Sequence, residues 1–213
     1  MKILNEIRRP INLPLSKKLL YTASIFVMGV ILGVISKALD ETASNLLPHF
    51  LEVLDLRNFL SRMGVWIFLA VLISVYSKSP VRSAINVFLF FVGMVGSYYL
   101  YTIRIAGFFP KSYMMIWVIM TVVSPFLAFI CWYAKGKGTI AISISSLIFM
   151  LVSRPAFGFG VWYFYIKYKL ELLLWIAMIF ILYQSPKQII KVVTIGFILS
   201  FLIAETNLFW RML

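Results

Sequence analysis

The chain has 213 residues, of which 62% are hydrophobic, and a formal net charge of +13. Its mean hydropathy of +0.98 excludes a soluble globular domain, because a chain of this size has too little interior to bury so much apolar surface. Nucleic-acid binding is also disfavoured, since the lysines and arginines are scattered over short loops and form no basic domain or stripe. The composition predicts an all-α integral membrane protein with a single transmembrane domain, 1–213.

Residues 1–18 form a basic N-terminal segment in which Glu6 is the one acid. Pro10 and Pro14 interrupt any long helix here, so we expect a cytoplasmic segment at the headgroup surface, in contact with the bilayer and its anionic lipids. The apolar run 19–39 that follows is long enough to span a bilayer and lacks a small-residue cleavage site. It is therefore expected to be retained as a leading transmembrane helix.

Within this run, Gly29 and Gly33 place two small residues on one helix face. Such a face allows close contact with another helix. Internal packing is the favoured interpretation, and contact with a partner membrane subunit is the alternative.

The polar interval 40–62 predicts an amphipathic helix that lies flat in the extracytoplasmic interface. Apolar residues recur at helical spacing on one face: Leu47, Phe50, Leu51, Leu54 and Phe59. Polar residues occupy the other face: His49, Glu52, Asp55, Asn58 and Arg62.

Three helical hairpins with basic tips follow, which makes about seven transmembrane helices in all. Their helices are expected over 64–76, 84–101, 113–134, 139–153, 170–183 and 189–209. Their tips lie at 78–82, 135–138 and 183–187. Because basic loops stay in the cytoplasm, this pattern predicts a cell-membrane protein with a cytoplasmic N-terminus and an extracytoplasmic C-terminus. In the fourth helix Pro125 should cause a kink unless Ser124 or a neighbour satisfies the freed carbonyl.

The chemistry of most enzymes is missing from this sequence. His49 is the one histidine and Cys131 the one cysteine, so we expect no disulfide, no metal site, no catalytic triad and no cofactor. A phosphate-binding loop is also absent. A lipid-modifying membrane enzyme is therefore a remote alternative.

Charged residues at the expected outer helix ends are the candidate ligand-binding groups, because charge at membrane depth is costly. They are Arg104, Arg154, Glu171 and Glu205, with Tyr98, Tyr99 and Trp117 as a possible aromatic lining. The alternative is that the charges extend to the interface and the aromatic residues form an ordinary interfacial belt.

Arg154 is the strongest candidate, because Pro155, Gly158 and Gly160 predict irregular backbone directly after it. It could clamp an anionic group or form a structural bridge with Glu171 or Glu205. The segment 154–169 is expected to be interfacial, or part of a long, broken sixth helix.

The segments 54–80, 107–117 and 124–138 resemble a family of small, uncharacterised polytopic membrane proteins of Gram-positive bacteria. That resemblance implies a topology and no activity. In size and helix number the chain is also loosely similar to the substrate-binding membrane subunits of vitamin-type uptake transporters. We expect a transport-related protein, either a small permease or a substrate-capturing subunit. A non-transporting accessory subunit is the alternative.

The topology is testable with reporter fusions. A reporter fused at Lys137 should give a cytoplasmic signal, because the basic tip stays inside, and one at Asn45 should give an extracytoplasmic signal. An extracytoplasmic signal at Lys137 would contradict the hairpin scheme.

Overall fold

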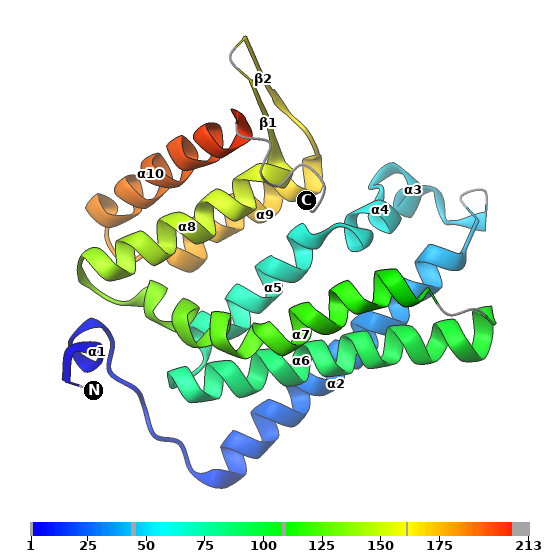
Figure 1. The fold of residues 1–213 in the computed structure, drawn as a ribbon, viewed down its shortest axis with the longest axis horizontal. Helices are drawn as coiled ribbons and strands as arrows, with labels where there is room; N and C mark the ends of the chain where they lie inside the picture. The colour runs from blue at the N-terminus through cyan, green and yellow to red at the C-terminus, as the bar shows by residue number, and fades with distance from the viewer. Residues whose placement is uncertain (1, 44–45, 108–109, 161, 206–213) are drawn as a thin grey trace. The chain divides into compact units, whose positions relative to one another are not determined.

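The computed structural model describes residues 2–43, 46–107, 110–160 and 162–205 (Figure 1). The reporter position Asn45 and the end of the expected helix 189–209 lie outside these residues. The chain forms two compact units, which are described separately. Unit 1 comprises Met1–Arg9, Arg62–Val75 and Ile130–Leu213, and unit 2 comprises Pro10–Ser61 and Tyr76–Phe129.

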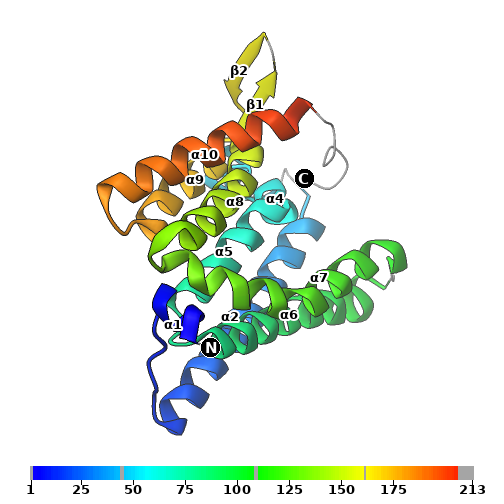
Figure 2. The same ribbon diagram turned by 60° about the vertical axis from the view of Figure 1, so that its left-hand side comes forward.

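Unit 2 is built on the close packing of two long helices. Its elements are α2 (Leu15–Glu41), α3 (His49–Val53), α4 (Leu56–Ser61), α6 (Pro80–Tyr101), the π-helical turn η2 (Thr102–Ala106) and most of α7 (Lys111–Cys131). Helices α2 and α6 lie side by side in both views (Figures 1 and 2).

Glycine makes the contact between α2 and α6 possible. A β-carbon on Gly29 would collide with the carbonyl oxygen of Phe90, and one on Gly33 with the side chain of Ser97. The Ser97 hydroxyl donates to the carbonyl of Val30 over 3.0 Å, which adds a polar contact at the same crossing. The glycine face thus serves internal packing, and a partner subunit at this face stays a prediction.

Polar side chains make contacts at the start of α6 and at Pro125 of α7. The hydroxyl of Ser79 accepts a hydrogen bond from the backbone of Arg82 at the start of α6, and the Arg82 guanidinium donates to the carbonyl of Lys18 over 2.7 Å. The basic tip 78–82 therefore lies beside the first turn of α2. In α7, Pro125 removes the donor to Thr121, and the Ser124 hydroxyl donates to that carbonyl over 2.9 Å. The expected compensation at Pro125 is confirmed.

Unit 1 contains the remaining elements. They are α1 (Lys2–Ile7), α5 (Met63–Tyr76), the 3₁₀ turn η3 (Trp132–Lys135), α8 (Gly138–Ala156), β1 (Phe157–Gly160), β2 (Tyr163–Ile166), α9 (Lys169–Leu182) and α10 (Pro186–Glu205). Its core joins α5, α8, α9 and α10 through buried residues that include Val75, Phe149, Val152, Met178 and Val192.

The basic tips of unit 1 meet at one end of the unit. The amide of Gln188 donates to the carbonyl of Gly136 over 3.3 Å, which joins the tips before α8 and α10. The guanidinium of Arg8 donates to the carbonyls of Val75 and Trp132 over 2.8 and 2.6 Å, and burial lowers its pKa. Arg8 thus ties the N-terminal segment to these helix ends, and contact of this segment with the headgroup surface stays a prediction.

Five of the described helices are long and apolar enough to cross a membrane: α2, α6, α7, α8 and α10. Helices α5 and α9 have only 14 residues each. A helix of this length extends over about 21 Å, less than the ~30 Å of a hydrocarbon core. The all-α architecture and the membrane-compatible helices are confirmed, and seven membrane crossings remain a prediction.

Two segments differ from the expected helices. In the interval 40–62, the described residues after the end of α2 form two short α-helices, α3 and α4, because Asp55 between them adopts a left-handed conformation with φ 52°. Aspartate tolerates this conformation better than most residues. A residue in this conformation cannot continue a right-handed helix. The irregular segment after Arg154 forms an antiparallel hairpin of β1 and β2, in keeping with its aromatic composition.

Two glycine substitutions in the same unit test the packing of α2 on α6. Gly33→Ala should lower the free energy of unfolding by about 1–3 kcal/mol, because the added methyl group meets packed atoms of α6. Gly96→Ala is the matched control, since a β-carbon there has open space around it. It should be neutral or stabilising by up to ~1 kcal/mol. If both substitutions change the free energy of unfolding of the detergent-solubilised protein equally, the close packing of α2 on α6 at Gly33 is contradicted.

Candidate functional site

The predicted ligand-binding residues are divided between the two units. Arg154 and Glu171 belong to unit 1, and Tyr98, Tyr99, Arg104 and Trp117 belong to unit 2. Glu205 ends α10, and its side chain lies outside the described part of the chain. The two groups are therefore considered separately.

In unit 2, Tyr98 belongs to a charged cluster at the C-terminal end of α2. Lys37 is 2% exposed and pairs with Asp40 over 3.2 Å and with Glu41. The hydroxyl of Tyr98 donates to Asp40 over 3.1 Å. These opposite charges compensate one another within the cluster, which indicates a structural tie between α2 and α6.

The other predicted residues of unit 2 include two aromatic side chains with ring contacts. Tyr99 packs edge-on against Tyr98, with ring centroids 5.4 Å apart. Trp117 packs against Tyr113 on α7, and Arg104 is exposed in η2.

Unit 1 contains a buried carboxylate at the start of α9. Glu171 is 1% exposed, and its Oε1 atom is paired with Nε of Arg62, the residue before α5. The Arg62 guanidinium also lies over the ring of Tyr168, 3.9 Å from its centroid. Within the described residues, the second oxygen of Glu171, Oε2, has no hydrogen-bond partner.

Local sequence places these groups together. Tyr168 is the N-cap of α9, so Glu171 falls in the first turn, where the helix dipole favours a negative charge. Gly64 gives room on α5, because a β-carbon there would lie 3.3 Å from Pro155 and 3.7 Å from Glu171. The indole of Trp175 donates to the hydroxyl of Ser153 over 2.8 Å and ties α9 to α8. The starts of α5 and α9 thus meet the end of α8.

Two further cations lie near this carboxylate. Arg154 is half-buried in the last turn of α8, and in the described part of the chain its guanidinium has no ion-pair or hydrogen-bond partner. Burial lowers the pKa of Lys167, the charges of Arg154 and Arg62 lower it further, and Glu171 raises it. Among the described residues, this neighbourhood therefore holds three positive charges and one carboxylate.

Such an arrangement can hold an anion. Arginine presents a planar fork of donors that matches a carboxylate or a phosphate group. A metal is a poorer fit, because the described residues contain no group of three histidine, cysteine or acidic side chains. Sequence reasoning missed the role of Arg62, because no local pattern around it points to a partner 109 positions away.

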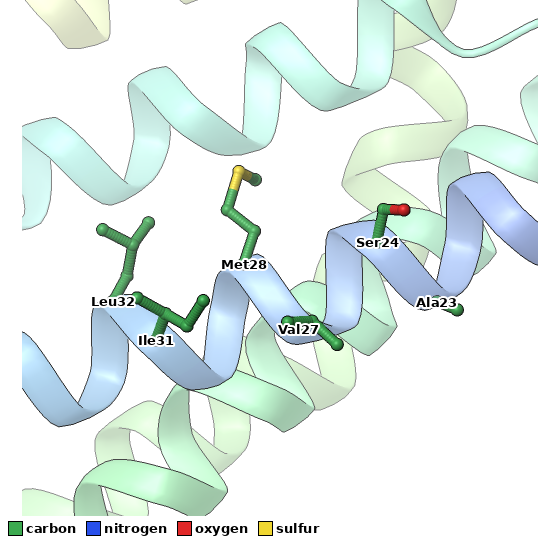
Figure 3. A pocket seen from close by; sticks show the side chains of 6 residues that line it. All are labelled: Ala23, Ser24, Val27, Met28, Ile31 and Leu32. Carbon is green, nitrogen blue, oxygen red and sulfur yellow. The ribbon is translucent and has the colours of Figure 1, made fainter.

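A shallow hollow of about 470 Å³ lies elsewhere, along α2 of unit 2 (Figure 3). Its lining comes from this helix alone: Ala23, Ser24, Val27, Met28, Ile31 and Leu32. The lining is almost wholly apolar and includes none of the predicted ligand-binding residues.

Comparison with known proteins adds nothing to this geometry, because no family model, curated protein or solved structure matches the chain. The resemblance to a Gram-positive membrane-protein family stays a prediction.

The Arg62–Glu171 pair predicts a strong dependence of stability on one carboxylate. Glu171→Gln should lower the free energy of unfolding by about 2–3 kcal/mol, because it leaves Arg62 without its counter-charge. The effect falls below that of a fully buried pair because the Arg62 side chain keeps 17% exposure.

Glu52→Gln is the matched control, since Glu52 is exposed on α3 and should change stability by no more than ~0.5 kcal/mol. Denaturant unfolding in micelles measures both values. A Glu171→Gln variant as stable as the wild type would show that the Arg62–Glu171 pair contributes nothing to the free energy of unfolding.

Proposed function

We propose that the chain is a transport-related integral membrane protein, a small permease or a substrate-capturing subunit that works with partner subunits. We further propose that Arg154 binds an anionic group of the substrate. One observation carries this proposal: Glu171 is paired with Arg62, so the nearby Arg154 has no counter-charge within the described residues.

The position of this arginine in a membrane-compatible helix supports a functional role. Charged residues in such helices commonly mark ligand or ion pathways. Arg154 lies in the last turn of α8, and Pro155 and the strand β1 follow it. The excess of positive charge around Glu171 would also attract an anion.

The structural bridge between Arg154 and Glu171 is the weaker interpretation. Glu171 uses Oε1 to pair with Arg62, and Oε2 accepts no hydrogen bond from the described residues. Arg154 therefore forms no hydrogen bond with this carboxylate within the described residues.

A non-transporting accessory subunit is the second candidate, and the hollow on α2 favours it. A nearly apolar depression with Ala23 and Ser24 in its lining suits a helix of another membrane protein. An enzyme that modifies lipid remains the remote third candidate. We propose the cell membrane as the location, with the N-terminus in the cytoplasm and the C-terminus outside.

Anion-induced thermal stabilisation tests the proposal. Purified protein in micelles is heated with phosphate, citrate or glutamate, each against chloride at equal ionic strength. At least one of these anions should raise the melting temperature of the wild type. Arg154→Lys should lose the increase and keep its basal stability, because lysine cannot form the bidentate contact.

Arg9→Lys is the control, since Arg9 is exposed in the N-terminal segment, and it should respond like the wild type. An equal shift in Arg154→Lys would contradict the assignment. An accessory subunit that docks through α2 would show no anion effect at all.

A further inference from the structure

The hairpin of β1 and β2 presents two different faces. Its strands are antiparallel, and Gly158 and Gly160 pair with Tyr165 and Tyr163. Because side chains alternate along a strand, these residues share one face and the phenylalanines lie on the other. Figures 1 and 2 show the hairpin extending beyond the end of α8.

The phenylalanine face fixes the hairpin to unit 1. The Phe159 ring packs edge-on against Phe197 of α10, with centroids 5.1 Å apart, and Phe157 packs against Trp175 of α9 at 5.3 Å. Phe164 completes the cluster through contacts with Phe157 and Phe197 at 5.3 and 5.8 Å. The β1 side of this face is therefore buried against unit 1, with Phe157 and Phe159 each 8% exposed, whereas Phe164 on β2 keeps 57% exposure.

The opposite face is a tyrosine surface that no described element covers. A β-carbon on Gly158 would collide with the ring of Tyr165, and one on Gly160 with the ring of Tyr163. The two rings thus lie flat over the glycine backbone, with centroids 5.9 Å apart. Their exposed fractions are 53% and 59%, and Trp162 beside them is 95% exposed.

We propose that this surface, formed by Tyr163 and Tyr165, acts together with the exposed Trp162 directly before β2 as a membrane anchor that lies between the lipid headgroups and the acyl chains. Tryptophan and tyrosine favour this zone because one end of each side chain is apolar and the other can remain hydrated. The inference rests on the proposal that α8 crosses the membrane. It does not depend on anion binding by Arg154.

Chain continuity identifies a bilayer as the occupant. Helix α8 is one of the membrane-compatible helices, and β1 begins at the residue after its last one. If α8 crosses the bilayer, the hairpin starts at the interface. Lys167 and Lys169 are exposed at its base, where an ammonium group can reach the headgroups. A water-soluble glycan or peptide would instead require the tyrosine surface to face water.

Site-directed spin labelling of the full chain in phosphatidylcholine–phosphatidylglycerol vesicles tests this inference. Cys131→Ser removes the native thiol, and Trp162→Cys then carries the nitroxide. Val122→Cys on α7, 58% exposed, is the expected lipid-facing reference, and Lys137→Cys in the basic tip is the expected aqueous reference. Collision rates with oxygen and with a water-soluble nickel chelate report the surroundings of each label.

The label at position 162 should be protected from nickel and accessible to oxygen, at a depth between the two references. Because Trp162 is so exposed, its replacement should leave the melting temperature unchanged. A label at 162 as accessible to nickel as the one at 137 would overturn the proposal. If the label at position 122 is equally accessible to nickel, the assignment of the chain to the membrane fails as well. The label at 122 therefore distinguishes failure of the anchor proposal from failure of the membrane proposal.

Discussion

The ion pair between Arg62 and Glu171 is the contact on which the arrangement at one end of unit 1 depends. Glu171 is almost fully buried, and an unpaired carboxylate in that position would be strongly destabilising. Arg62 supplies the compensating charge from the residue before α5, and its guanidinium also covers Tyr168. The start of α5 is thereby held to the start of α9. Gly64 then lets the end of α8 pack closely against α5. Arg154 and the hairpin belong to this end of α8 and the residues after it.

Unit 2 combines its helices in a different way. Lipid removes most of the hydrophobic driving force between helices, so association depends on close packing and polar contacts. Gly33 permits the backbones of α2 and α6 to approach, and Ser97 adds a hydrogen bond across the crossing. The buried charge of Lys37 is compensated by Asp40 and Glu41 one turn away. In unit 2 compensation is local, whereas in unit 1 it joins residues 109 positions apart.

That difference explains what could be predicted from the sequence. Features that depend on local spacing were accessible, such as the glycine face of α2 and the compensation of Pro125 by Ser124. The Arg62–Glu171 pair was not, because nothing in the neighbourhood of either residue specifies so distant a partner. Sequence reasoning singled out Glu171 as a charge at a helix end but placed Arg62 on an amphipathic helix. The hairpin was missed because its alternating pattern covers only a few aromatic residues between two strongly apolar helices.

The central claim is that Glu171 is committed to Arg62, which leaves Arg154 available for an anion. Two double-mutant cycles in the full chain test it directly, one for Arg62 with Glu171 and one for Arg154 with Glu171, all as glutamine substitutions. The first pair should show a coupling free energy above ~1.5 kcal/mol, and the second no more than about 0.5 kcal/mol. A large coupling between Arg154 and Glu171, with little between Arg62 and Glu171, would contradict the claim.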